Sequence, residues 1–189
     1  MLVKEIEIEF KNLLNQEEFE RLLKYFPFSD QPVIQTNYYF DTKSRTLAKH
    51  RHALRIRQKN QHFRLTLKQP QGDHILETHD ILTQSEAESW IKGHIIPKPN
   101  ITAQLEKLHI QPTDLFCYGK LVTKRYSYEI EDITLVLDCS KYNGKMDYEL
   151  EVEAQDHHQG LAFFNQLLRE HQIKKRLTPN KIERFFASL

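Results

Sequence analysis

Apolar and charged residues alternate along the first eleven residues of the chain. The apolar members are Ile6, Ile8 and Phe10, and the charged members are Glu5, Glu7, Glu9 and Lys11. This period of two is typical of a strand with one apolar and one polar face. Three carboxylates on one face repel each other unless positive charge lies among them. Two interpretations follow: a charged strand exposed to solvent, or half of a site for a divalent cation, which prefers carboxylate oxygens.

The same alternation predicts seven further strands, which follow one another in hairpin-like pairs. Their ranges are 33–41, 52–58, 62–68, 74–82, 116–130, 133–138 and 145–153. Asn143-Gly144 is a strong hairpin signal between the last two. Capping boxes at Asn15 and Thr83 predict two helices, a third helix is expected near 157–171, and Thr178-Pro179 is expected to begin a short terminal helix. The pattern therefore predicts an α+β fold with an antiparallel sheet.

Charges of opposite sign occupy different strands of this sheet. Acidic residues gather on the first strand and on the last two, whereas Arg and Lys gather on the hairpin at 52–68. Two architectures satisfy the alternation. One is a sheet with helices on one side and water on the other, and the second is a closed barrel whose polar face lines the interior. The segregation of charge resembles a site that holds an anion beside a metal.

Composition narrows the class of protein. The 189 residues are 39% hydrophobic and 28% charged, as expected for one globular domain spanning 1–189. Lys and Arg number 27 against 26 Asp and Glu, so no overall charge favours nucleic acid or an anionic membrane. We expect no membrane span, and we expect Cys117 and Cys139 to be free thiols in the cytoplasm. The ten histidines form no metal set, and we interpret them, His79 included, as surface or structural residues.

Several short motifs together resemble the CYTH family, also called triphosphate tunnel metalloenzymes. They are the ExExK motif at Glu7, Glu9 and Lys11, the segments 37–42, 54–57, 65–70 and 124–126, Leu137-Asp138, the acidic strand 148–153, and Lys181 with Arg184. The resemblance implies a closed eight-stranded antiparallel β-barrel that forms a tunnel flanked by helices. It also implies a triphosphate substrate bound with Mg²⁺ or Mn²⁺.

The resemblance also implies roles for individual residues. The implied metal ligands are Glu7, Glu9, Asp138, Glu149, Glu151 and Glu153. The implied phosphate-binding residues are Arg55, Arg57, Lys68, Arg125 and Lys181. Lys11 and Glu9 are the implied catalytic residues. The roles of Arg64, Arg184 and Glu77 stay open.

The expected function is hydrolysis of a triphosphate, with inorganic tripolyphosphate favoured, by a protein that acts as a monomer or homodimer. Adenylyl cyclase and thiamine triphosphatase are alternatives within the family. The first needs an adenine pocket, and the second needs an aromatic platform for which Trp90 is only a generic candidate. A non-catalytic module that binds polyphosphate or nucleotides is an alternative of another class. Such a module would need basic residues to bind its polyanionic ligand, and it would have little use for six carboxylates.

Overall fold

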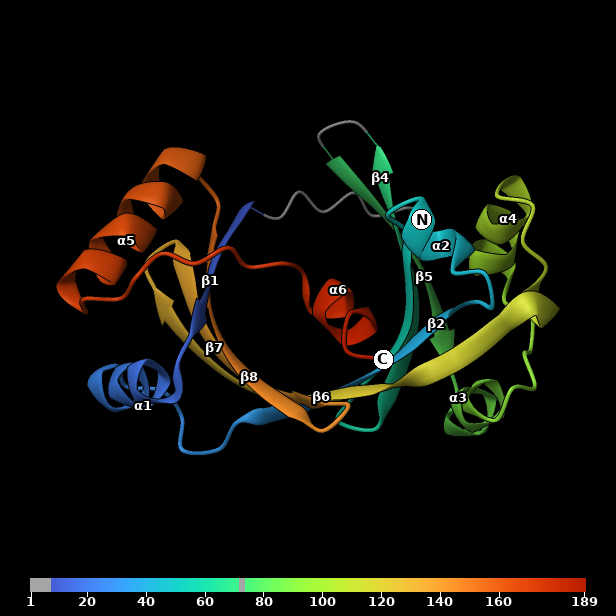
Figure 1. Ribbon diagram of the computed structural model, residues 1–189, viewed down its shortest axis with the longest axis horizontal. Helices are drawn as coiled ribbons and strands as arrows, with labels where there is room; N and C mark the ends of the chain where they lie inside the picture. Colours follow the sequence, from blue (N-terminus) through green and yellow to red (C-terminus); the bar gives the residue numbers. More distant parts are fainter. Residues whose placement is uncertain (1–7, 72–73) are drawn as a thin grey trace. The chain divides into compact units, whose positions relative to one another are not determined.

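The computed structural model describes residues 8–71 and 74–189, and it contains the eight predicted strands. The strands are β1 (Ile8–Leu14), β2 (Val33–Thr42), β3 (Ala53–Lys59), β4 (His62–Gln71), β5 (His74–Leu82), β6 (Leu115–Ile130), β7 (Ile133–Tyr142) and β8 (Lys145–Ala154). The helices are α1 (Gln16–Tyr25), α2 (Thr46–Lys49), α3 (Gln84–Ile91), α4 (Pro99–Lys107), α5 (His157–Glu170) and α6 (Lys181–Phe186), with a 3₁₀ turn at Pro112–Asp114 (Figure 1). No helix in these two ranges is long and apolar enough to cross a membrane.

The strands form an antiparallel sheet in the order β1-β8-β7-β6-β2-β3-β4-β5, flanked by helices. The α+β class and the antiparallel sheet are therefore confirmed. Among the described residues this strand order has two ends, β1 and β5, so closure into a tunnel stays a prediction. The chain divides into two compact units, residues Gln35–Leu121 and residues 8–34 with Val122–Leu189. A single domain over 1–189 also stays a prediction.

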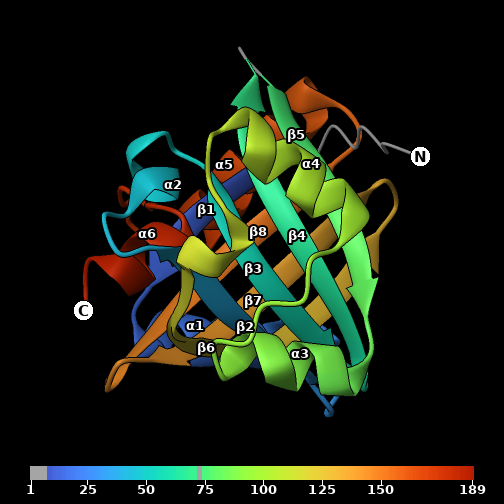
Figure 2. The ribbon, with the colours of Figure 1, turned by 90° about the vertical axis from the view of Figure 1, so that its right-hand side faces the viewer.

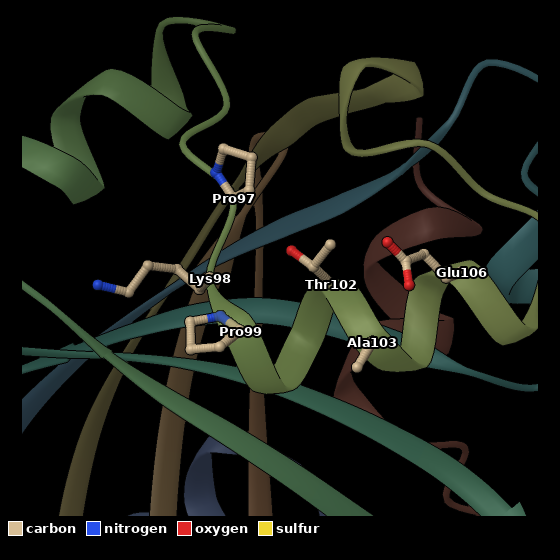
Figure 3. A pocket seen from close by; sticks show the side chains of 6 residues that line it. All are labelled: Pro97, Lys98, Pro99, Thr102, Ala103 and Glu106. Atoms are coloured by element: carbon tan, nitrogen blue, oxygen red, sulfur yellow. The ribbon is translucent and has the colours of Figure 1, made fainter.

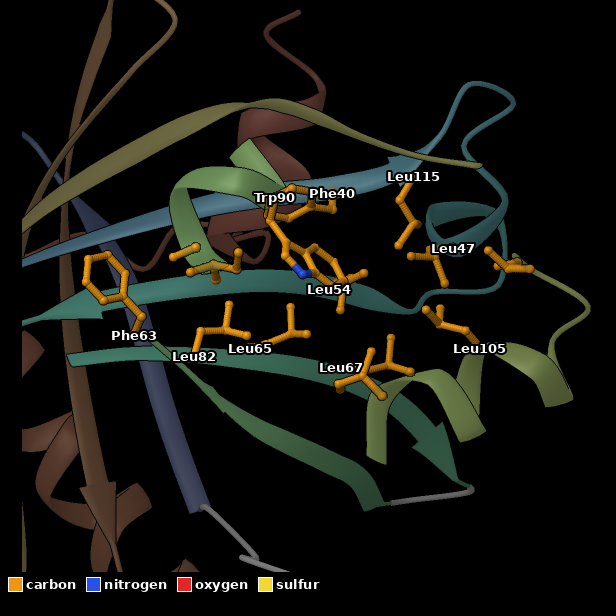
Figure 4. Packing of buried hydrophobic residues seen from close by; sticks show 14 residues of the cluster. Phe40, Leu47, Leu54, Phe63, Leu65, Leu67, Leu82, Trp90, Leu105 and Leu115 are labelled. Carbon is orange, nitrogen blue, oxygen red and sulfur yellow. The ribbon is translucent and has the colours of Figure 1, made fainter. Parts of the chain in front are cut away.

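The first unit places α3 and α4 over one face of β3, β4 and β5 (Figure 2). Leu54, Leu65 and Leu67 are fully buried on that face, because alternate residues of each strand point toward the helices. Trp90 of α3 lies edge-on to Phe40, with ring centroids 5.5 Å apart (Figure 4). The opposite face of these strands carries the basic residues of the hairpin.

The second unit is built on β1, β8, β7 and the second half of β6. Its core lies between the apolar faces of these strands and helices α1 and α5, with Leu22, Leu135 and Leu150 fully buried. Helix α6 lies on the other side of β7 and β8 (Figure 1). Asn143 and Gly144 both have positive φ, 45° and 73°, as a two-residue hairpin between β7 and β8 requires.

Two predicted boundaries were wrong. The first strand was expected over the first eleven residues, but β1 continues to Leu14 because it pairs with β8 over its whole length. The last helix was expected to begin at Thr178-Pro179, but it begins at Lys181. The Thr178 hydroxyl instead accepts a hydrogen bond from the Leu13 N–H at 2.9 Å, which holds this segment in an extended form.

Residues 171–180, called here the C-terminal strap, are bound to β1 and α1. The buried Asn12 side chain donates to the Lys174 carbonyl at 3.0 Å and accepts from the Arg176 N–H at 2.7 Å. The Arg176 guanidinium donates to both Glu18 carboxylate oxygens, at 2.7 and 2.9 Å. Burial alone would raise the pKa of Glu18, but the bonds from Arg176 and from the Asn15 N–H outweigh it and lower that pKa.

Glu18→Gln should lower the free energy of unfolding by about 1–3 kcal/mol at pH 7, because it removes the charge that satisfies Arg176 and Asn15. Glu18 has a lowered pKa when folded, so its contribution is present above the unfolded value and is lost as pH falls through the folded one. Urea unfolding at pH 7 and pH 3 should therefore show a smaller difference from wild type at pH 3. Glu17→Gln, at an exposed position of the same turn, is the control. Equal stability of both variants would refute the role of Glu18.

Candidate active site

Carboxylates from three strands of the second unit lie on one face of the sheet. The register pairs Glu9 of β1 with Glu153 of β8, and it pairs Asp138 of β7 with Glu149 of β8. Alternation along β8 adds Glu151 to the same face. Oxygens of Glu9, Glu151 and Glu153 lie within 4.8 Å of one another. The alternation seen in the sequence thus brings acids about 140 residues apart into one cluster.

Two cations of the same unit neutralise the buried part of this cluster. The Lys181 ammonium of α6 lies 3.0 Å from Asp138 Oδ2 and 2.8 Å from Glu149 Oε1, and it also pairs with Glu151. The Arg125 guanidinium of β6 binds Asp138 through two bonds of 2.9 and 2.6 Å. Arg125 also donates to Glu151 at 2.5 Å and lies 3.6 Å from Glu153.

A third cation, Arg184, extends this network. Its guanidinium donates to Asp147 Oδ2 at 2.9 Å and also to Glu149. The Tyr142 hydroxyl donates to the same Asp147 oxygen at 2.6 Å. Burial, together with the Asp147 charge, raises the pKa of Tyr142 to about 12, so its proton stays in place as a donor. The role of Arg184, open from the sequence, is therefore at least to pair with two acids of this face.

The surrounding charges separate the pKa values of the two buried acids Glu149 and Glu151. Asp138 is 0% exposed, Glu149 1% and Glu151 3%. Burial raises the pKa of Glu149 to about 7 against the pull of Lys181, and the neighbouring Glu151 adds to the rise. Burial also acts on Glu151, but Lys181 and Arg125 outweigh it and hold the pKa of Glu151 well below its usual range. Glu149 therefore holds a proton to higher pH than Glu151 does.

The ExExK motif contributes at the edge of the acidic cluster. The Lys11 ammonium lies 3.3 Å from Glu9 Oε1 and donates to the Asn180 side chain at the start of α6. Lys11 is opposite Glu151 in the register of β1 and β8. Glu7, the other implied acid of the motif, lies outside the described residues. The Glu9 side chain is 29% exposed, so it is accessible to a ligand.

The basic residues of the hairpin share the polar face of the first unit. In the register, Arg57 lies between Asn37 and Arg64, and Arg55 lies between Tyr39 and Thr66. Arg57 Nε donates to Asn37 Oδ1 at 3.1 Å. Arg55 Nε is buried and has no hydrogen-bond partner among the described residues. A buried guanidinium N–H without an acceptor is costly, and a bound anion would satisfy it.

Lys68 and Glu77 form an ion pair at the next position along this face. Burial alone would raise the pKa of Glu77, but the bond from Lys68 and the charges of Lys68 and Arg55 lower it, so Glu77 is ionised. Glu77, whose role the sequence left open, therefore serves as the ionic partner of Lys68. Arg64 is exposed.

Two surface hollows of the first unit lie away from these charged residues. One of about 350 Å³ lies at the start of α4, where Lys98 extends away from Thr102 and Glu106 (Figure 3). Lys98 is paired with Glu86 at 3.0 Å. Another of about 520 Å³ is lined by Thr42, Lys43, Phe116 and other residues. Neither is lined by the acids or the hairpin bases described above.

Sequence reasoning gave no site role to Asp147 and Asn180. Asp147 shares the parity of Glu149 and Glu151 along β8, so the alternation contained a signal for it. Asn180 had no such signal, because its contact with Lys11 depends on where the C-terminal strap ends.

The eight-stranded antiparallel sheet with flanking helices is the fold class expected for the triphosphate tunnel family. The CYTH domain matches residues 5–186, and the chain belongs to the CYTH family. It is 42% identical to "Putative triphosphatase YjbK" of Bacillus subtilis over 183 residues, which cover 96% of this chain and 95% of that protein.

Solved structures agree with this family. The structure of a protein from Bacillus halodurans named a "putative adenylate cyclase" is 37% identical, covers 97% of this chain and 98% of its own, and has a TM-score of 0.89. The Hippeastrum protein HpAC1 is 24% identical, with 96% of both chains covered and a TM-score of 0.79. Because its sequence identity is only 24%, the HpAC1 structure is evidence for the fold alone.

Lys181→Met should lower the free energy of unfolding by about 3–5 kcal/mol, because it leaves Asp138, Glu149 and Glu151 with too little positive charge. Thermal unfolding monitored by circular dichroism measures this loss. Lys175→Met, at an exposed position of the C-terminal strap, is the matched control and should leave stability unchanged. If Lys181→Met is as stable as the control, Lys181 does not neutralise the buried acids.

Proposed function

We propose that the protein is a metal-dependent hydrolase of triphosphates that acts best on inorganic tripolyphosphate. The acidic cluster carries this proposal, because three carboxylates with oxygens within 4.8 Å of one another are more than a binding module for anions needs. The bases of the hairpin support it, because a polyanionic substrate requires compensating positive charge.

The carboxylate set fits a hard divalent cation. Mg²⁺ and Mn²⁺ prefer oxygen ligands, and the cluster offers oxygens only. Glu9, Glu151 and Glu153 would hold the ion, with Glu7 as the remaining acid of the motif. Asp138 and Glu149, which do not belong to the group of three acids whose oxygens lie within 4.8 Å of one another, would orient the neighbouring carboxylates or act through water. A bound ion would supply charge neutralisation at the phosphate oxygens and activation of water.

The phosphate groups would be bound by guanidinium and ammonium donors. Arg55 and Arg57 offer planar donor pairs that match phosphate oxygens, and Lys68 offers a point charge beside them. Arg125 and Lys181 would reach the substrate from within the acidic cluster. The buried Nε of Arg55 is the donor for which an anion would bring the largest gain.

In the proposed reaction, water attacks the terminal phosphorus and the bond to the leaving diphosphate oxygen breaks. Lys11 donates to an oxygen of the transferred phosphoryl group, which places positive charge where negative charge develops. Glu9 accepts a hydrogen bond from the attacking water and so orients it. The contact between Lys11 and Glu9, 3.3 Å, keeps both groups at one place on β1.

The names of the relatives support a triphosphatase, but one of them also supports the alternative of an adenylyl cyclase. The Bacillus subtilis relative carries a triphosphatase name, whereas the Bacillus halodurans relative carries the name of an adenylate cyclase. A cyclase would release diphosphate and cyclic AMP from ATP, and a hydrolase would release phosphate. We favour hydrolysis, because the relative with the triphosphatase name is 42% identical to this chain and the relative with the cyclase name is 37% identical.

Product analysis tests the proposed function. Tripolyphosphate, thiamine triphosphate and ATP are each incubated with the protein and Mg²⁺ or Mn²⁺, and phosphate, diphosphate and cyclic AMP are measured. We expect phosphate release that depends on the metal and is fastest with tripolyphosphate. Cyclic AMP as the main product would establish the cyclase, and binding without turnover of any triphosphate would establish the binding module.

Glu9→Gln and Glu151→Gln should each lower kcat/KM for tripolyphosphate by about two orders of magnitude, because an amide is a neutral and weaker ligand. Glu129→Gln is the control, since Glu129 lies on the same polar face but outside the cluster. Circular dichroism shows whether the variants fold. Full activity of either cluster variant would refute the metal assignment.

Arg57→Ala should raise KM about tenfold or more with a smaller change in kcat, because a hydrogen bond between charged groups contributes about 1.5–3 kcal/mol. Initial rates over a range of tripolyphosphate concentrations separate the two constants. Lys59→Ala removes an exposed charge from the same strand face and should change KM little. An unchanged KM in Arg57→Ala would exclude a phosphate contact.

A further inference from the structure

His79 of β5 is held at both nitrogens of its ring. Thr66 Oγ1 lies 2.9 Å from Nδ1, and Glu77 Oε2 lies 3.4 Å from Nε2. The other oxygen of Glu77 pairs with the Lys68 ammonium. Four side chains therefore form a continuous chain of polar contacts, from Thr66 through His79 and Glu77 to Lys68, within the first unit.

The register of β4 and β5 explains why these four side chains meet. Thr66 lies opposite His79, and Lys68 lies opposite Glu77, so two neighbouring cross-strand pairs share the polar face. The backbone at His79 is also fixed, because its carbonyl accepts from Asn100 Nδ2 of α4 at 3.0 Å. The ring is thus placed by the sheet and by α4.

The partners of the ring decide where its proton lies. A threonine hydroxyl can donate to Nδ1, whereas the Glu77 carboxylate can only accept. The arrangement therefore favours a proton on Nε2, directed at Glu77. Glu77 then receives a donor from His79 on one oxygen and the Lys68 ammonium on the other, which fixes the orientation of its carboxylate.

A Thr-His-Glu row can also suggest a nucleophile activated by a base. The burial of Thr66 argues against that interpretation, because the residue is only 2% exposed and its hydroxyl is already bonded to His79. A substrate could not reach this oxygen without displacing the strand. The accessible end of the chain is Lys68, whose side chain is 28% exposed.

We propose that His79 is a positioning residue for the binding of triphosphate: it holds Glu77, and through Glu77 it holds the Lys68 ammonium at a fixed place beside Arg55. This inference rests on the proposed function for its substrate, but the geometry of Lys68 is independent of it. A donor that is already in place loses less conformational freedom when the anion binds, so substrate affinity rises without new contacts.

The test compares His79→Leu, which removes both contacts, with His79→Gln, whose amide retains a donor toward Glu77. His62→Leu is the matched control, because His62 is an exposed histidine on the same face of β4. The ¹H–¹⁵N signal of the Lys68 ammonium, assigned by its absence in Lys68→Met, reports the position of that group without any substrate. KM and kcat for tripolyphosphate report its use.

We expect His79→Leu to shift or broaden the Lys68 signal and to raise KM about five- to tenfold, with kcat changed less than about twofold. His79→Gln should restore most of both, and His62→Leu should change neither. An unchanged Lys68 signal in His79→Leu would overturn the proposal, as would a loss confined to kcat. If the wild type hydrolyses no triphosphate, the proposed function fails, whereas the Lys68 signal still decides whether His79 positions the ammonium.

Discussion

The burial of three carboxylates is the constraint on which the second unit depends. Asp138, Glu149 and Glu151 are almost completely buried, and buried charges destabilise a fold unless they are paired and hydrogen-bonded. Arg125 and Lys181 supply that pairing, and Arg184 extends it. An acidic face of this kind is not the most stable way to build a sheet. The proposed metal site gives this arrangement a reason, because Glu151 would be a ligand of the ion.

This constraint explains the path of the C-terminal residues. Helix α6 has only six residues, so its own hydrogen bonds cannot hold it in place. The C-terminal strap is fixed by Asn12 and Glu18, and the Asn143 side chain of the β7–β8 turn donates to the Phe185 carbonyl at 3.2 Å. Together these contacts place Lys181 over the acids. Residues outside the acidic cluster therefore support the site.

Most of the sheet and much of each polar face could be predicted from the sequence, because alternation determines which residues share a face. The pairing of Glu9 with Glu153 follows from that rule once the strands are adjacent. The end of β1 and the start of α6 were missed, since both depend on contacts between distant segments, such as Leu13 with Thr178. The partners of His79 were missed for a related reason: a one-residue shift in the register of β4 and β5 would have placed other residues opposite the ring.

The central claim is that the acidic face of the second unit is a metal centre. Crystals grown or soaked with Mn²⁺ test it most directly, through anomalous scattering measured near the manganese absorption edge. The account predicts one strong peak among Glu9, Glu151 and Glu153, which disappears in Glu151→Gln. A manganese peak elsewhere in the protein would contradict it. So would the absence of any peak at saturating Mn²⁺ while Lys181 stays paired with the acids.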